Sequence, residues 1–441
     1  MIQVTKMAMT IRVPDANDPN GANFVNWLLS ILVKEKVVNM GTATEKMYGL
    51  TKDDMGNLRV PFSFAKQTLG FQSLNYNQLP RRNISCNIVL GAGGKDFQIP
   101  TYKMMVQTII EQGSCFLSLQ CSGGKTMLAV KLFAELGIKA AVVTDAILIF
   151  PQWVKVLKET TNARIAEIKS PVDVLPEADI YVMMITACKK IHPKVLEPIK
   201  LLLVDEATYF CTNKRIPALL NFTPCYTLGL CAEIKRTDGM HYFLPLFFGP
   251  KVIRRISDKP FMVYRVETTF KPVIQYMKRK GTLDWNTVLD SIANNEERNN
   301  KIVNLCRSMP DSKIIIGTKR KDQANYLFNA LKQCGESVAI LIESMKSFPQ
   351  CRILVGIYSK MGKGVDVKNL CTDWEGEVFD VAILAADLCN PEQFVGRVFR
   401  HDNPIIYDIV DDFTTLRKHF DKERLPWYIS RRGTIVRTIL Q

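Results

Sequence analysis

The chain has 441 residues, 47% of them hydrophobic and 23% charged, and its formal net charge is +15 at pH 7. This length leaves room for two or three domains with sizeable cores, and the composition is that of a soluble globular protein. The sequence does not predict a membrane-spanning protein, because the longest apolar stretch, residues 24–33, is too short to cross a bilayer.

The cysteines and the charge narrow the class of protein further. None of the twelve cysteines forms a CxxC pair, so the sequence predicts neither a zinc ribbon nor an iron–sulfur cluster. Several lie inside apolar runs, as in proteins of a reducing compartment, and the N-terminus has no apolar signal-peptide core. We therefore expect a soluble intracellular protein, and its positive charge favours a polyanionic partner.

Residues 1–95 carry no catalytic pattern and are expected to form a small accessory domain. The run NFVNWLLSILVKEKV predicts an amphipathic helix of about four turns, and RVPFSFAKQTLGF predicts a strand or a short helix. A glycine-rich segment, GAGGKD, begins at Gly91. We interpret it as a hairpin or linker turn, because Asp96 would repel phosphate and Pro100 disfavours a following helix.

Residues 96–255 alternate between predicted strands and helices. Apolar strands such as KAAVVT, IYVMMI and KLLLV are separated by helical runs such as MLAVKLFAEL and PQWVKVLKET. Strands without a polar face, joined by crossover helices, predict a parallel sheet that is covered on both faces.

A phosphate-binding turn is predicted inside this region. The strand CFLSL is followed by Ser122, Gly123 and Gly124, and then by a helix that opens on Lys125 and Thr126. In such a turn, backbone N–H groups and the helix N-terminus face the phosphates, Lys125 reaches the β- and γ-phosphates, and the Thr126 hydroxyl binds Mg²⁺. The longer G-x-x-x-x-G-K-[ST] pattern is incomplete, so an ordinary glycine turn is the alternative until the context decides.

The context comes from an acidic pair 80 positions after the lysine. The apolar run LLLV ends in Asp205 and Glu206. A carboxylate at the end of a buried strand is costly without a partner such as a metal ion. We predict that Asp205 completes the Mg²⁺ shell and that Glu206 orients and deprotonates the attacking water. The alternative is a strand that runs out into a polar turn.

Residues 256–441 open with a basic connecting segment. Nine lysines and arginines lie between residues 251 and 280, and they are either a solvated face or a surface that tracks phosphates. A helix is predicted over residues 285–309, followed by a second alternation of strands and helices and then a basic tail. The two halves therefore resemble each other in layout, as two α/β lobes joined by a linker.

A polar stripe is predicted in the second half. In the run QFVGRVFR, Gln393, Arg397 and Arg400 have helical spacing and could reach a γ-phosphate. The alternative is a basic surface helix. Against it, Gly396 would cost about 1 kcal/mol in a helix interior, which suggests close approach of another backbone.

Together these motifs resemble those of superfamily 2 helicases over residues 97–430. CSGGKT is similar to motif I, DEAT to motif II, LGLCAE to motif III, VGIYSKMGKGVD to motif V and QFVGRVFR to motif VI. The resemblance implies an α/β fold with two tandem RecA-like lobes, residues 96–255 and 256–441, beside the accessory domain. It also implies ATP and Mg²⁺ as cofactors and nucleotide contacts by Gly364 and Asp366.

The pattern is closest to the transcription-linked helicases of large DNA viruses and to excision-repair translocases. It departs from the family where Cys231, Ala232 and Glu233 replace a hydroxyl-rich motif III, and where Lys103 replaces the glutamine of the adenine-side helix. The resemblance implies a nucleic-acid partner, DNA being favoured over RNA, with transcription or replication proteins as further partners. If the protein is viral, we expect it in the host cytoplasm or the virion.

The resulting hypothesis is an ATP-dependent helicase or translocase that steps along a strand through its phosphates. Three alternatives stay open: a translocase that displaces proteins, polymerase or transcript without unwinding, a nucleic-acid-binding factor with weak ATPase activity, and a P-loop kinase. The kinase explains neither the second lobe nor QFVGRVFR.

Overall fold

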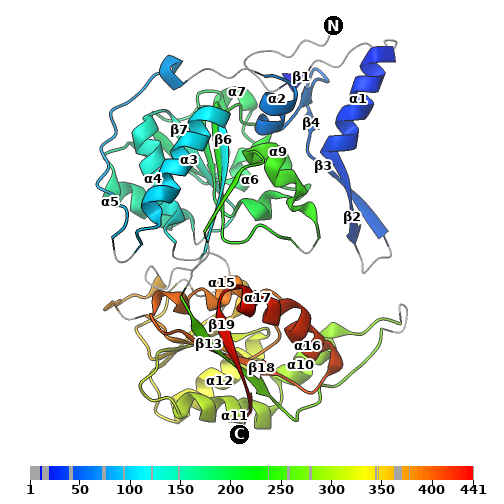
Figure 1. Ribbon diagram of the computed structural model, residues 1–441, viewed down its shortest axis with the longest axis vertical. Helices are drawn as coiled ribbons and strands as arrows, with labels where there is room; N and C mark the ends of the chain where they lie inside the picture. Colours follow the sequence, from blue (N-terminus) through cyan, green and yellow to red (C-terminus); the bar gives the residue numbers. More distant parts are fainter. Residues whose placement is uncertain are drawn as a thin grey trace. The chain divides into compact units, whose positions relative to one another are not determined.

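Two seven-stranded sheets, each parallel throughout, lie at the centres of the two compact units into which the chain divides (Figure 1). Unit 1 comprises residues 1–119 and 123–255, and unit 2 comprises residues 120–122 and 256–441. The computed structural model describes residues 10–440 except 12–18, 39–42, 72–75, 93–94, 121–122, 148, 237, 256–258, 278–280, 343–344, 346, 362–369 and 377.

The sheet of unit 1 places its phosphate-loop strand next to the edge. In order across the sheet, the strands are β12 (Val252–Arg255), β6 (Ser114–Leu119), β11 (Tyr226–Cys231), β10 (Leu201–Val204), β7 (Ala140–Thr144), β9 (Ile180–Met184) and β8 (Ile165–Ile168). The helices of this lobe are α3 (Gln98–Gln112), α4 (Lys125–Leu136), α5 (Phe150–Thr160), α6 (Ile185–Cys188), α7 (Pro193–Leu196), α8 (Ile216–Leu219) and α9 (Leu244–Phe248), with 3₁₀ turns η3 (Ala207–Phe210) and η4 (Met240–Phe243).

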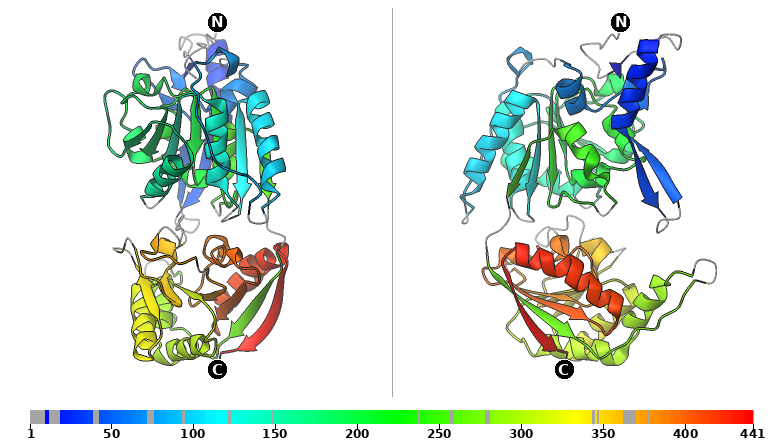
Figure 2. Two further views of the ribbon diagram at one scale, coloured as in Figure 1. Left: turned by 90° about the vertical axis from the view of Figure 1, so that its left-hand side faces the viewer. Right: turned by 45° about the vertical axis from the view of Figure 1, so that its right-hand side comes forward.

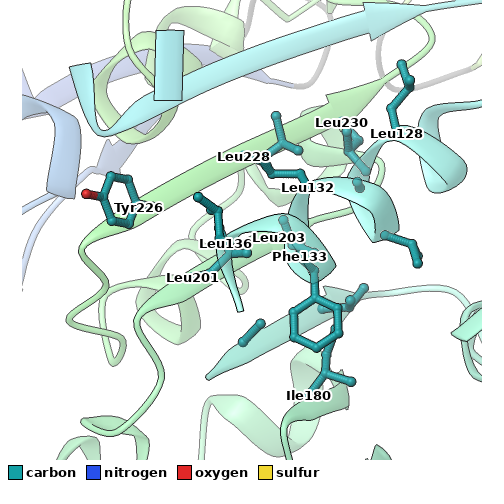
Figure 3. Packing of buried hydrophobic residues seen from close by; sticks show 14 of the residues in the cluster. Leu128, Leu132, Phe133, Leu136, Ile180, Leu201, Leu203, Tyr226, Leu228 and Leu230 are labelled. Atoms are coloured by element: carbon teal, nitrogen blue, oxygen red, sulfur yellow. The ribbon is translucent and has the colours of Figure 1, made fainter. Parts of the chain in front are cut away.

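Helices cover both faces of this sheet, as its buried central strands require. Leu117 and Leu119 of β6 face the core made with α3, α4 and α5, whereas Phe116 faces the opposite core, made with α6, α8 and α9. Figure 3 shows the first of these cores, in which α4 lies against β10 and β11 through Leu128, Leu132, Phe133, Leu136, Leu201, Leu203, Leu228 and Leu230. Each such fully buried leucine contributes about 1.5–3 kcal/mol.

The N-terminal accessory elements belong to the same compact unit. They are β1 (Thr10–Ile11), α1 (Pro19–Leu32), β2 (Val33–Val38), β3 (Ala43–Tyr48), β4 (Thr51–Lys52), β5 (Leu58–Arg59), α2 (Phe62–Thr68) and η2 (Tyr76–Gln78). Strands β2 and β3 form an antiparallel hairpin that continues directly from α1. Residues 81–90 then run along the lobe, where the backbone N–H of Arg82 donates to the carbonyl of Gly137 at 2.7 Å.

Unit 2 repeats the architecture of a covered parallel sheet. Its strand order is β15 (Val338–Leu341), β16 (Ile353–Ile357), β14 (Ile314–Thr318), β17 (Val381–Leu384), β18 (Ile405–Val410), β13 (Phe261–Glu267) and β19 (Gly433–Ile439). Its helices are α10 (Trp285–Ala293), α11 (Glu296–Arg307), α12 (Lys321–Gln333), α13 (Tyr358–Met361), α15 (Glu392–Val395), α16 (Thr414–His419) and α17 (Leu425–Ser430), with η5 (Val398–Arg400) and the π turn η6 (Phe420–Arg424).

The two faces of the second sheet carry different helices. Val266 of β13 packs in the core that contains α11 and α12. Phe261 and Arg265, on the other face of the same strand, contact Tyr428 of α17 and Phe420 of η6. Figure 2 shows the C-terminal helices, coloured red, against this sheet. The expectation of two RecA-like lobes with an accessory N-terminal part is confirmed. Within the described part of the chain, no helix combines the length and apolar content needed to cross a membrane.

Two helices predicted from the sequence prove to be interrupted. The run at residues 23–37 is helical only to Leu32, because its β-branched end continues as β2 and pairs with β3. The run at residues 285–309 is divided into α10 and α11. The side chain of Asn295 accepts the backbone N–H of Arg298 at 2.8 Å and so caps a new helix there.

A strand replaces part of the predicted basic connection. Phe261–Glu267 is β13, which lies between β18 and β19 inside the second sheet. Its alternate residues bury Phe261, Val263 and Arg265 on one face, a periodicity that its basic neighbours obscured. Lys278, Arg279 and Lys280, the basic cluster farther along the predicted connection, lie outside the described residues.

Candidate nucleotide-binding site

The glycine turn of unit 1 lies between the end of β6 and the first residue of α4. Gly124 has φ +88°, a left-handed conformation that glycine adopts without strain, and it precedes a 12-residue helix. Lys125 and Thr126 are the first two residues of that helix, whose N-terminal N–H groups form an anion-binding end. The Lys125 ammonium donates to the carbonyl of Leu119 at 2.9 Å. Ser122 lies outside the described residues.

A buried glutamine that the sequence analysis did not select supports this turn. The Gln98 side chain donates through Nε2 to the carbonyl of Gly123 at 3.1 Å and accepts through Oε1 from the N–H of Gly91 at 3.2 Å. A Cβ on Gly124 would lie 2.2 Å from Gln98 Nε2, so the glutamine would have to move to accommodate one. Lys103, the residue that the helicase motif singles out, lies one and a half turns farther along α3. In the sequence, the only signal at Gln98 is a polar residue at the opening of an amphipathic helix.

The acidic pair lies at the same edge of the sheet as the glycine turn. Strands β6, β11 and β10 are parallel neighbours, so their carboxyl ends point the same way. Asp205 follows β10 directly, and its Oδ1 accepts the backbone N–H of Glu206 at 2.9 Å. Glu206 has φ +50°, and it is one of two non-glycine residues with a positive φ in the described part of the chain. Such strain in a non-glycine residue concentrates at functional sites.

Asp205 is held by a hydrogen bond from a distant helix. It is buried, and its Oδ2 accepts the indole N–H of Trp153, on α5, at 2.7 Å. Burial raises the pKa of the Asp205 carboxyl, while the Trp153 hydrogen bond and the charge of Lys125 act in the opposite direction. The structure therefore brings Gly123, Gly124, Lys125, Thr126, Asp205 and Glu206 together at one edge of unit 1.

A series of hydrogen bonds and ion pairs connects the acidic motif with the accessory hairpin, β2 and β3. Arg236 donates to the carbonyl of Thr208, two residues beyond Glu206, at 2.7 Å and forms a paired contact with Asp238. The hydrogen bonds from Arg236 are the main reason that the pKa of Asp238 is far below its ordinary value. Lys36 of β2 reaches the same carboxylate at 3.1 Å. The accessory hairpin is thus linked through Asp238 and Arg236 to the Thr208 carbonyl, in the turn that follows β10.

The candidate residues of unit 2 do not lie on one helix. The predicted helix is α15 over Glu392–Val395, followed by a separate 3₁₀ turn, η5, so the prediction of a single two-turn helix is wrong. Gln393 is on α15, Arg397 precedes η5, and Arg400 is the last residue of η5. A glycine at position 396, which lowers helix propensity, stands at the break.

Two anchors fix this broken segment within unit 2. Arg397 is buried and donates through Nη2 to the carbonyl of Met361 at 3.1 Å, directly before residues 362–369. Gly364 and Asp366, which belong to that range, lie outside the described residues. Glu392 accepts from Arg431 Nη2 at 2.6 Å and from an indole N–H of α17 at 3.2 Å. The C-terminal tail therefore holds α15 in place.

Unit 2 contains a second group of potential metal ligands, and its carboxylate already forms ion pairs within the protein. Within the described residues, Asp387, Cys389 and His419 bring one ligand atom each within 4.8 Å of one another. The two oxygens of Asp387 contact Arg424 at 2.6 Å and His419 at 2.7 Å. Burial raises the pKa of Asp387, but the His419 hydrogen bond and the Arg424 charge together lower it below its ordinary value. The carboxylate is thus stabilised without an ion.

Comparison with known proteins points to one family. No protein-family model matches the chain. A protein of Invertebrate iridescent virus 6 named as a helicase, 161L, is 32% identical over 414 residues, which cover 85% of this chain and 88% of that protein. A protein of Frog virus 3 named as a helicase, 055L, is 29% identical over 395 residues and covers 87% of each chain.

More distant similarities agree with the fold. A protein of Acanthamoeba polyphaga mimivirus named as an ATP-dependent RNA helicase is 24% identical over 348 residues, which cover 72% of this chain and 65% of that protein. Among solved structures, S. cerevisiae Dbp5 bound to RNA and ADP BeF3 superposes with a TM-score of 0.51 at 12% identity, covering 86% of this chain and 93% of that one. At that identity the superposition bears on the fold alone.

Proposed function

The chain belongs to the superfamily 2 helicases, and from that premise we propose that it is a Mg²⁺-dependent ATPase that moves along nucleic acid. One observation carries the proposal. The glycine turn at the N-terminus of α4 and the Asp205–Glu206 pair after β10 lie at the same edge of one parallel sheet. A phosphate cradle beside two carboxylates is the arrangement that phosphoryl transfer to water needs.

The residues of unit 1 divide the chemistry among them. Lys125 and the N–H groups of the turn bind the phosphates, and Gly124 adopts the left-handed conformation that the turn requires. A carboxylate and a hydroxyl suit Mg²⁺, so we assign Asp205 and Thr126 as the residues that hold it. When bound, the ion offsets the negative charge that develops on the phosphates. Glu206, which follows Asp205 with a left-handed backbone, orients the water and accepts its proton.

Unit 2 supplies the second set of groups. We assign Gln393, Arg397 and Arg400 contacts with the γ-phosphate, whose charge the two arginines would stabilise. The hydrogen bond from Arg397 to the Met361 carbonyl supports a role in coupling, because Met361 directly precedes in sequence the segment that contains Gly364 and Asp366. By resemblance, that segment contacts the nucleotide.

Nucleic acid is the proposed track. The net charge of +15 favours a polyanion, and contacts to phosphates alone would make binding independent of sequence. We propose DNA as the primary strand, because two of the relatives come from large DNA viruses. The mimivirus relative is named as an RNA helicase, so both polymers belong in the test.

The test is ATP turnover with single- and double-stranded DNA and RNA as competing stimulators. We expect Mg²⁺-dependent hydrolysis that at least one DNA form stimulates, and none in Lys125→Ala. Hydrolysis that no nucleic acid stimulates would overturn the helicase assignment. A strand-displacement assay then separates unwinding from translocation, since a translocase without unwinding would hydrolyse ATP but release no strand.

A further inference from the structure

Trp153 differs from its neighbours on α5. The helix packs Phe150, Trp153, Val154 and Leu157 into the core of unit 1, a spacing that places them on one face. Trp153 is only 1% exposed and is the one residue of this set with a polar atom in its side chain. A buried indole N–H needs an acceptor, and this one donates to Asp205 Oδ2 at 2.7 Å.

The two hydrogen bonds to Asp205 determine how its carboxylate is oriented. The Trp153 N–H binds Oδ2 and the backbone N–H of Glu206 binds Oδ1, so each oxygen has one donor from a fixed direction. A carboxylate oxygen has two acceptor positions, which leaves each oxygen able to bind a second group. If the indole donor is removed, the Glu206 N–H is the remaining one of these two restraints on the carboxylate. The carboxylate could then rotate about the Cβ–Cγ bond of Asp205.

We propose that Trp153 is a positioning residue that sets the orientation of Asp205 toward the metal ion. The inference rests on the proposed function, because it assigns a supporting residue to the same site. Groups that hydrogen-bond to metal-binding carboxylates typically change metal affinity or activity by about 10- to 100-fold when they are removed. Bulk packing by the indole ring is the competing explanation, and it requires the ring but not the N–H.

The first experiment separates the N–H from the ring. Trp153→Phe keeps an aromatic side chain in the core and removes the donor. Phe150→Leu is the matched control, since it removes ring volume from the same helix without touching Asp205. We expect Trp153→Phe to raise the half-saturating Mg²⁺ concentration for ATP hydrolysis by about 10-fold. At saturating Mg²⁺ its KM for ATP should stay within about twofold of the parent, as expected when only the metal contact is weakened.

The control and the parent make the outcome decisive. Phe150→Leu should keep the Mg²⁺ dependence of the parent, whatever it does to thermal stability. An unchanged half-saturating Mg²⁺ concentration in a folded Trp153→Phe protein would overturn the inference, and so would an equal shift in both variants. If the unmodified protein shows no Mg²⁺-dependent hydrolysis, the proposed function fails, which is a different result.

A second measurement needs neither turnover nor a folded variant. Trp153 is the one buried tryptophan of five, since Trp27 is 40% exposed and the other three are partly exposed. Its indole N–H should therefore be the slowest of the five to exchange in D₂O, which identifies its signal in ¹⁵N-edited NMR spectra. Adding Mg²⁺ to the protein saturated with a non-hydrolysable ATP analogue should shift that signal. An indole signal that stays unmoved at saturating Mg²⁺ would overturn the inference.

Discussion

Replacing Gly124 with alanine should damage the phosphate loop in two separable ways. The first is conformational, because φ +88° costs a residue with a Cβ about 1–2 kcal/mol. The second is steric, because the new Cβ would lie 2.2 Å from Gln98 Nε2. The glutamine can move aside, but it then loses its bonds to Gly123 and Gly91, at about 0.5–1.5 kcal/mol each.

These contributions predict a total local destabilisation of about 2–5 kcal/mol. In a Gln98→Ala background the steric part is already absent, so the same glycine substitution should cost only about 1–2 kcal/mol. The two substitutions are therefore expected to couple by about 1–3 kcal/mol, within the range known for residues in contact.

Native-state hydrogen exchange followed by mass spectrometry is the appropriate assay, because a two-unit chain need not unfold in one step. Peptides that cover β6 and α4 should exchange at least about 30-fold faster in Gly124→Ala, the equivalent of about 2 kcal/mol. Gly335→Ala is the matched control. Its φ is +79° and no atom lies within 4 Å of its Cβ position, so it should show only the conformational cost, near α12. Additive effects of Gln98→Ala and Gly124→Ala would refute the reasoning.

Three further predictions test the site and the fold. Lys125→Ala should abolish ATP hydrolysis yet retain nucleic-acid binding in a filter assay, and turnover within about threefold of the parent would contradict its role. Glu206→Gln should bind ATP without hydrolysing it and release nucleic acid slowly, whereas loss of ATP binding would make Glu206 structural. Arg298→Met should destabilise unit 2 by about 3–5 kcal/mol. It removes the positive charge that pairs with the buried carboxylate of Asp411, which lies 2.7 Å from Arg298 Nε. Arg298→Met with Asp411→Asn should recover part of that loss in hydrogen exchange, and no recovery would argue against the ion pair.

Strand patterns predicted much of the fold, because a strand that is buried on both faces has a mainly apolar sequence without a polar face. The runs around Leu117 and Leu203 show this, and their order along the chain also placed Lys125 and Asp205 at strand ends. Contacts between distant segments were not predictable in the same way. The indole N–H of Trp153 reaches a carboxylate 52 positions away, and its spacing on α5 identifies only a core residue.

Element boundaries depended on local competition that periodicity does not measure. Asn295 carries no apolar signal, yet its side chain caps α11 two residues after α10 ends at Ala293. The segment 33–38 continues the apolar pattern of α1, but its pairing with β3 makes it a strand. Sheet pairing overrode helix periodicity there, since a partner strand satisfies the same backbone groups.

The segment at residues 81–90 limits how far the chain can be shortened from its N-terminus. Besides the Arg82–Gly137 contact, the N–H of Asn87 donates to the carbonyl of Thr160, and the N–H of Ser85 to Asn162 Oδ1. Arg82 also pairs with Asp179 at 2.9 Å. A chain cut at residue 96, where the sequence pattern changes, would lose every one of these bonds. A fragment intended for crystallisation should therefore begin no later than residue 80, so that unit 1 keeps the hydrogen bonds and the ion pair made by residues 81–90.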